Sequence, residues 1–308
     1  IPVTDIFSHS MTGETLVPHE WLAQIAFALA YKLMGLSGDV FLTALVIGLT
    51  FAIKYREIVE RGTPILVAAM VLLWAVAVSS IHWLARPHIF TLLFVSIWHF
   101  QLEKFRAGDG KNTFIFPLLM LIWANTHGAF IAGFVIWGVY FFEWAVQRHQ
   151  KNSTWEQGRR LALIGGLSFA VTFINPSGYL LWTTSLGYIQ NSYLTSHTVE
   201  YMPPNFQNPS MWPFALMIFY GLLSLSGRKV LALRESLLMA GWMFMSLFSM
   251  RNIPLFAIIT IPAFTSLLHA QTSQINWLTG LNERIKNVEN QLKSGVWSTL
   301  AVILIGLA

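Results

Sequence analysis

The fold is decided by long apolar stretches, of which the clearest covers residues 63–83 and reads TPILVAAMVLLWAVAVSSIHW. This stretch contains no Asp, Glu, Lys or Arg, and it is long enough for a helix to cross about 30 Å of hydrocarbon. Similar runs predict spans near residues 39–55, 63–83, 88–105, 113–126, 128–146, 161–176, 211–226, 236–250 and 253–269, and a tenth that begins near 295. The predicted fold class is an all-α integral membrane protein, a polytopic helical bundle with about 9–10 transmembrane helices.

The composition of the 308 residues excludes several protein classes. Hydrophobic residues make up 55% of the chain and charged residues only 11%, whereas soluble domains carry about 25% charged residues. Because the chain has no Cys, it has no disulfides, thiolate metal sites or cysteine nucleophiles. The formal net charge of +5 does not predict nucleic acid binding, since the basic residues are scattered in short clusters.

The basic residues predict the orientation of the chain. With the exception of Lys32, Arg86 and Arg251, the 19 Lys and Arg residues fall in alternate loops, near 54–61, 104–111, 148–160, 228–234 and 284–293. The positive-inside rule makes these loops cytoplasmic. We therefore expect a multi-pass protein of the cell inner (plasma) membrane, whose opposite, extracytoplasmic face carries the functional residues.

The N-terminal part of the chain is predicted to be an outer loop. Within residues 20–35, polar or small residues recur at every fourth position, at Glu20, Gln24, Ala28 and Lys32, as in an amphipathic helix on the outer membrane surface. We expect a single transmembrane domain over 1–308, with a first outer loop at 1–38 and a second at 177–210. Since the chain begins with Ile1 and its last apolar run stops at Ala308, both ends are expected to be truncated.

The predicted outer face collects polar side chains from several segments. They include Asp5, His9, His19, Glu20, His82, Arg86, His88, Asn125, His127, Glu200, Tyr201 and Arg251. Ionisable groups near membrane depth are costly, which favours a shared polar cavity. The alternative is a solvated surface with ordinary helix caps.

Two outer-face arginines are candidates for binding a phosphate. A guanidinium can bind a phosphate through two hydrogen bonds, which suits Arg86 and Arg251, with His88 beside the first. The alternative for each arginine is snorkelling to lipid headgroups. The segment around Asn125 and His127 interrupts an apolar run, so it either lines a cavity or forms a packed structural turn.

Motifs for other chemistries are absent from the sequence. No HExxH pair, GxSxG elbow, phosphate loop or dinucleotide fingerprint occurs. No cofactor is predicted with certainty. The scattered His and carboxylate residues leave open a bound divalent metal ion, for which no ligand set can be named.

Five short motifs resemble those of bacterial membrane proteins of the GT-C glycosyltransferase superfamily. They are Asp5-Ile6-Phe7-Ser8-His9, His19-Glu20-Trp21-Leu22, Arg86-Pro87-His88, Trp123-Ala124-Asn125-Thr126-His127-Gly128 and Asn175-Pro176-Ser177-Gly178. In layout, roughly residues 1–269 are similar to the protein O-mannosyltransferase and lipid A aminoarabinose transferase branch. Those proteins often carry an adjacent Asp-Glu pair, whereas here Asp5 is followed by Ile6.

The resemblance implies a lipid-dependent enzyme. A hexosyl or pentosyl group would move from a polyprenyl-phosphate donor to an acceptor that the sequence does not identify, among membrane lipids and without nucleic acid. Asp5 takes the position of the catalytic base, and Arg86, Arg251 and His88 would bind the donor phosphate. The remaining substrate-binding candidates are His9, His19, Glu20, Asn125, His127, Glu200 and Tyr201.

Two interpretations remain open at the level of sequence. Loop 177–210 is aromatic and free of Lys and Arg, so it is either a lid over the donor or an interfacial aromatic belt. A transporter or flippase for an anionic lipid or small solute would also place arginines and broken helices around a cavity.

Overall fold

The computed structural model describes residues 4–6, 8–110, 112–224 and 230–292, and the regular secondary structure of this part is helical apart from one isolated bridge between Thr4 and Thr15. Each span predicted between residues 39 and 269 overlaps a helix of the described residues, although the ends differ by several residues. The predicted span at 295 lies outside the described residues. The all-α, polytopic membrane fold is therefore confirmed.

Four helical segments are long and apolar enough to cross a membrane. They are Leu36–Glu60, Ile65–His82, Gly128–His149 and Met250–Thr272. Shorter apolar helices occupy Trp21–Met34, Ile115–Thr126 and Pro209–Ser224. The other helices are shorter or more polar, so the predicted total of 9–10 transmembrane helices stays a prediction.

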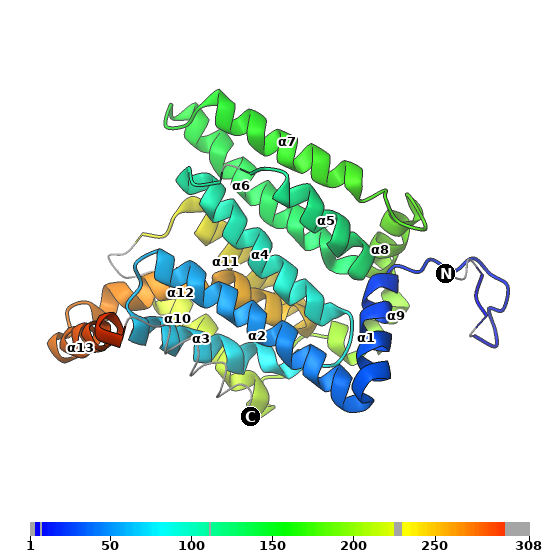
Figure 1. Cartoon of the computed structure of the whole chain (residues 1–308), viewed down its shortest axis with the longest axis horizontal. Coiled ribbons are helices and arrows are strands. Elements are labelled where there is room, and N and C mark those ends of the chain that lie inside the picture. The colour runs from blue at the N-terminus through cyan, green and yellow to red at the C-terminus, as the bar shows by residue number, and fades with distance from the viewer. Residues whose placement is uncertain (1–3, 7, 111, 225–229, 293–308) are drawn as a thin grey trace. The chain divides into compact units, whose positions relative to one another are not determined.

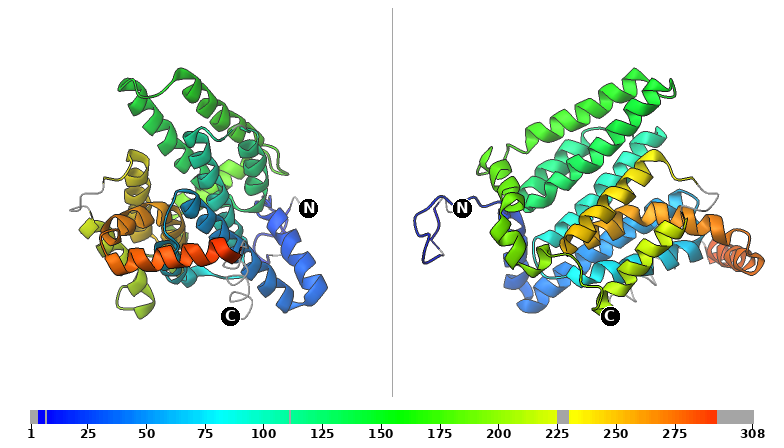
Figure 2. Two further views of the ribbon diagram at one scale, coloured as in Figure 1. Left: turned by 60° about the vertical axis from the view of Figure 1, so that its left-hand side comes forward. Right: turned by 180° about the vertical axis from the view of Figure 1, so that it is seen from behind.

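The chain divides into two compact units (Figures 1 and 2). Unit 1 takes described residues of 1–43 and 84–199, and unit 2 those of 44–83 and 200–308. This division does not test the prediction of a single transmembrane domain.

Unit 1 is built from helices that pack around α5. Its elements are α1 (Trp21–Met34), the start of α2 (Leu36–Glu60), α4 (His88–Ala107), α5 (Ile115–Thr126), η2 (Gly128–Phe130), α6 (Ile131–His149), α7 (Trp155–Val171), α8 (Leu180–Gln190) and α9 (Ser192–His197). Helices α4 and α7 both contact α5, and α1 lies against it as well. The segment predicted as the outer loop 177–210 is largely helical, because it contains α8, α9, the 3-10 helix η3 and the start of η4.

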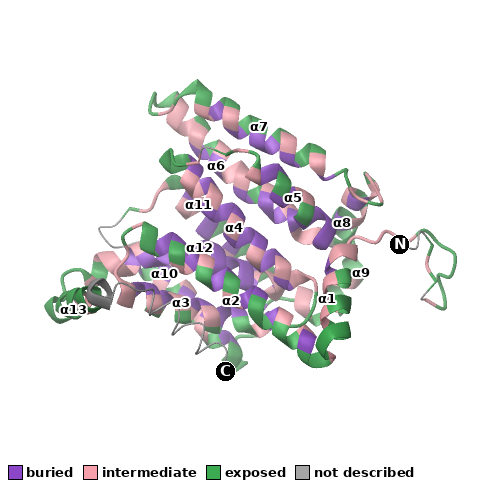
Figure 3. Ribbon diagram, viewed as in Figure 1, coloured by how far each residue is buried: buried purple, intermediate pink, exposed green. Residues whose placement is uncertain are grey.

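Unit 2 is centred on α12. Its elements are the rest of α2, α3 (Ile65–Ser79), η1 (Ser80–His82), η3 (Val199–Tyr201, whose first residue belongs to unit 1), η4 (Pro209–Met211), α10 (Trp212–Ser224), α11 (Leu233–Phe248), η5 (Met250–Asn252), α12 (Ile253–Thr272) and α13 (Asn276–Leu292). Helix α12 packs on both α3 and α11. Within its apolar window 78% of α12 is buried, against 28% for α2, so α12 is surrounded by protein (Figure 3).

Helix α1 confirms the predicted helix near residues 20–35. Its 14 residues span about 21 Å, which is too short to cross the bilayer. Gly35 alone, at φ +62°, separates α1 from α2. The next glycine, Gly38, lies so close to the backbone of Ala30 that a Cβ would clash there. Whether α1 lies on the membrane surface stays a prediction.

Several helices extend beyond the apolar runs that predicted them, so most of the described basic residues that were expected in loops lie in helices instead, Lys54 and Arg234 among them. Lys54 lies inside α2 and Arg234 inside α11, and both side chains are buried. Helix α7 begins at Trp155, where the Thr154 hydroxyl accepts a hydrogen bond from the backbone of Gln157. Apolar periodicity does not detect a helical turn whose charged side chains are paired.

Helices α6 and α7 form an antiparallel hairpin held by two tryptophans that lie over two glycines. Trp137 covers Gly165 and Trp144 covers Gly158. The indole N–H of Trp137 donates to the backbone oxygen of Leu161 at 2.9 Å, which fixes the ring in place. A Cβ on Gly165 would lie 2.3 Å from this ring, so the close packing requires glycine.

Gly165→Ala is therefore expected to lower the free energy of unfolding by about 1–3 kcal/mol, because the added methyl displaces the Trp137 indole from its hydrogen bond. The neighbouring change Gly166→Ala is the matched control, since a Cβ there meets nothing within 4 Å. The midpoint of thermal unfolding in detergent, followed by near-ultraviolet circular dichroism, measures both. Equal midpoints for the two variants would contradict the predicted clash.

Candidate functional site

A carboxylate lies between two imidazoles where α1 begins and α5 ends. Glu20 precedes the first turn of α1, and its Oε1 is 3.5 Å from His127 Nε2 and 3.9 Å from His19 Nε2. The side chain of Glu20 is 26% exposed, whereas that of His127 is 5% exposed. A partly exposed carboxylate next to a buried imidazole can accept a proton and share its charge.

The protonation of His127 is directed by its partners. Trp123 Nε1 can only donate, and it donates to Thr91 Oγ1 at 3.0 Å. The backbone N–H of Ala129 donates to His127 Nδ1 at 3.4 Å, which makes Nδ1 an acceptor, and the Thr91 hydroxyl 2.9 Å from Nδ1 can donate to it as well. In the neutral ring the proton is therefore assigned to Nε2, the nitrogen that faces Glu20.

Asn125 joins three elements next to this site. Its Oδ1 accepts a hydrogen bond from Trp21 Nε1 at 2.8 Å, and its Nδ2 donates to the backbone oxygens of Leu121 and Ile174. These bonds connect α1, α5 and the segment after α7. The predicted substrate residue Asn125 thus has a structural role, which holds Glu20 near His127 through the neighbouring Trp21.

The motif Arg86-Pro87-His88 lies at the start of α4. The His88 ring is half-buried, and its centroid is 6.5 Å from that of His127. Arg86 is exposed two residues earlier, directly before Pro87. Of the predicted phosphate site, His88 therefore lies beside His127.

Helix α8 contacts the cluster through two side chains, Tyr188 and Ser185. Tyr188 packs against His19 with ring centroids 5.5 Å apart. A Cβ on Gly128 would lie 3.2 Å from Ser185 Oγ and 3.8 Å from His19, so a side chain at Gly128 would crowd both. The buried Ser185 hydroxyl has no hydrogen-bond partner among the described residues.

An open hollow of about 450 Å³ adjoins the cluster within unit 1. Its lining is mainly apolar and consists of Trp21, Leu22, Leu121, Ile122, Asn125, Ile174, Asn175 and Pro176. Trp21 and Asn125 line this hollow. The hydrogen bond between them, which we call the latch, also positions the neighbouring Glu20. An apolar hollow of this size beside a polar cluster suits an amphiphilic ligand.

The structure places Asp5 and His9 outside this cluster. Asp5 accepts hydrogen bonds from the backbone and the hydroxyl of Ser8, at 2.9 and 2.7 Å, and closes a local turn. His9 is exposed in the same segment. Figures 1 and 2 show that this segment projects away from the helices of unit 1.

Unit 2 holds the remaining predicted residues in a second cluster. The Arg251 guanidinium donates a hydrogen bond to the Tyr201 hydroxyl and lies 4.9 Å from the centre of that ring. Glu200 Oε2 is 3.5 Å from His82 Nε2. Backbone bonds hold this loop in place, since Met250 N–H donates to the oxygen of Met202. Arg86 belongs to unit 1, so the cavity that these residues were predicted to share with it stays a prediction.

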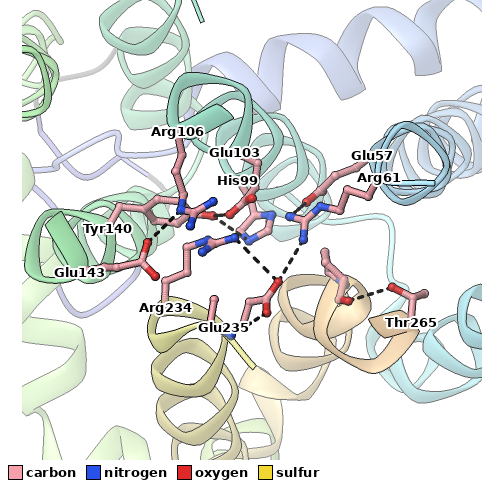
Figure 4. A network of polar contacts seen from close by, with 12 residues as sticks. Glu57, Arg61, His99, Glu103, Arg106, Tyr140, Glu143, Arg234, Glu235 and Thr265 are labelled. Carbon is pink, nitrogen blue, oxygen red and sulfur yellow. Dashed lines mark hydrogen bonds and ion pairs between the residues drawn. The ribbon is translucent and has the colours of Figure 1, made fainter. Parts of the chain in front are cut away.

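Largely buried ionic networks occur elsewhere in each unit (Figure 4). In unit 1, Tyr140 donates to Glu103 and contacts His99, while Arg106 pairs with Glu143 at 3.1 Å. Figure 4 also draws the network of unit 2.

In unit 2, Glu57 pairs with Arg61 at 2.9 Å and with the buried Lys54 at 2.5 Å, and Arg61 also reaches Glu235 at 3.1 Å. The sequence interpretation treated these basic residues only as topology markers and did not predict their carboxylate partners.

No group of three or more His, Asp or Glu side chains that could hold a metal ion occurs within the described residues. The ligands of a divalent ion are therefore not identified. Thr91 is the main residue of the site that the sequence interpretation missed. Its signal was its position three residues after His88, on the same face of α4.

Comparison of the chain with known proteins identifies no relative. No family model, no curated protein sequence and no solved structure matches the chain. Functional inference therefore rests on the site itself and on the motif resemblance.

Proposed function

We propose that this protein is a membrane glycosyltransferase that moves a sugar from a polyprenyl-phosphate donor to an acceptor at the extracytoplasmic face of the inner membrane. The observation that carries this proposal is Glu20, held against His127 and His19 beside an apolar hollow. The hollow suits the lipid part of a donor or acceptor, and the carboxylate suits the acceptor hydroxyl.

Two carboxylates compete for the role of base. Motif resemblance favours Asp5, whereas the geometry favours Glu20, because Asp5 is bonded to Ser8 within its own loop. We assign the role to Glu20. It would take the proton of the acceptor hydroxyl while the acceptor oxygen bonds to the anomeric carbon of the sugar. The bond from that carbon to the phosphate oxygen breaks, and polyprenyl phosphate leaves with its negative charge.

Fixed positive charge would stabilise the departing phosphate. Arg86 is near the Glu20 cluster through His88, and Arg251 is oriented by Tyr201. An arginine stacked on an aromatic ring is held ready to bind phosphate at lower entropic cost. We therefore propose both arginines as donor phosphate ligands.

Donor binding tests this assignment. The purified protein in lipid nanodiscs is expected to bind a polyprenyl-phosphate hexose or pentose saturably, and Arg86→Ala and Arg251→Ala are each expected to weaken binding by about 10–100-fold. Arg56→Ala is the control, because Arg56 is an exposed arginine paired with Glu60.

Three outcomes would contradict the proposal. The first is that the wild-type protein binds no donor. The second is that both arginine variants bind the donor as tightly as Arg56→Ala does. The third is that the donor crosses the membrane chemically unchanged when an acceptor-containing membrane extract is present. The last outcome would favour a transporter or flippase.

A further inference from the structure

Helix α13 has an apolar face that the described residues of unit 2 leave exposed. Trp277, Leu281 and Val288 are 68%, 40% and 48% exposed. Spacings of four and seven residues place these side chains on one face of the helix. The opposite face carries the polar residues Glu283 and Lys286.

A neighbouring stripe of α13 is anchored to unit 2. Leu278 and Ile285 are half-buried, and α13 contacts α3. The backbone N–H of Leu66 donates to Asn282 Oδ1 at 3.3 Å. The helix is thus attached to the first turn of a membrane-spanning segment, Ile65–His82.

The chain also attaches α13 to a second span. The segment Met250–Thr272 ends just before α13 begins at Asn276. One span therefore starts and another ends next to α13, which places this helix at the level where the protein leaves the membrane. At that level, an exposed apolar face that includes a tryptophan suits the boundary between headgroups and acyl chains.

We propose that α13 lies along the membrane surface and inserts Trp277, Leu281 and Val288 into the interfacial layer of the bilayer. The charged residues of α13 are Glu283, Arg284, Lys286 and Glu289, whose formal charges cancel. Burial of apolar surface, rather than attraction to anionic lipid, therefore drives the contact. This inference does not depend on the proposed enzymatic function.

Spin labelling of the full-length protein tests the proposal, and the absence of Cys makes single-cysteine variants straightforward. Leu281→Cys and Val288→Cys report on the apolar face, and Glu283→Cys and Lys286→Cys report on the polar face. All four native positions are exposed, so the label should not disturb packing. Accessibility to oxygen and to a water-soluble nickel chelate is measured in vesicles of phosphatidylcholine, with and without phosphatidylglycerol.

The labels at 281 and 288 are expected to be severalfold more accessible to oxygen than to the nickel chelate, and the labels at 283 and 286 should show the reverse in both lipids. Equal accessibility on the two faces would overturn the proposal, as would insertion that requires the anionic lipid. Spin–spin broadening at 281 and 288 that disappears on dilution with unlabelled protein would instead identify a second copy of the chain as the partner.

Discussion

Glu20→Gln is expected to lower the rate of sugar transfer by about 10²–10⁴-fold while donor binding is retained. The substitution keeps the shape of the side chain, but it removes the carboxylate that would accept the acceptor proton. The latch formed by Trp21 and Asn125 does not involve the Glu20 side chain, so the local fold should persist. Transfer of labelled sugar to an acceptor-containing membrane extract measures the rate.

Two carboxylate variants make this test specific. Glu14→Gln removes an exposed carboxylate from the same N-terminal segment and should leave transfer unchanged. Asp5→Asn should reduce transfer much less than Glu20→Gln does. If Asp5→Asn abolished transfer and Glu20→Gln preserved it, the base would be Asp5, as the motif resemblance implies. Loss of donor binding in Glu20→Gln would indicate a role in binding instead.

Glu57→Gln is expected to destabilise the protein by about 3–5 kcal/mol, because a buried ion pair loses one partner. Both Lys54 and Glu57 are essentially inaccessible, and the same carboxylate also binds Arg61. The neutral amide that the substitution introduces at position 57 cannot balance the charge of the buried Lys54 ammonium. The midpoint of thermal unfolding in detergent measures the loss.

Helix α2 offers its own control for this prediction. Glu60 pairs with Arg56 on the exposed side of the same helix, so Glu60→Gln should cost only about 0.3–0.5 kcal/mol. The double change Lys54→Met and Glu57→Leu should recover part of the stability, since it removes both buried charges. A similar loss in Glu57→Gln and Glu60→Gln would show that burial of the pair is unimportant.

The helices could be predicted from sequence, because each apolar run such as 63–83 reports directly on a segment that must be shielded from water. Helix ends were less predictable. Lys54 lies inside α2 rather than in a loop, because Glu57 neutralises it one turn later. Sequence spacing gave no indication that this pair is buried.

The candidate site was predictable only in part. His127 and Glu20 were predicted to share one face of the membrane, and unit 1 does bring them together. Their contact depends on Thr91, Trp123 and Asn125, whose partners are distant in sequence. Such partners become visible only when α4, α5 and α1 are packed, because no local pattern encodes contacts between distant segments.

The two tryptophan–glycine contacts also fix the register of α6 against α7 in unit 1. Trp137 and Trp144 are seven residues apart, as are Gly158 and Gly165, so sliding α6 past α7 by one turn would leave neither indole on a glycine. Helix α6 begins shortly after His127, and the chain after α7 presents the Ile174 oxygen that Asn125 binds. The register of this hairpin therefore determines where the Ile174 oxygen lies along the α6 axis relative to His127 and Asn125. An insertion within α6 or α7 would shift Ile174 relative to these two residues.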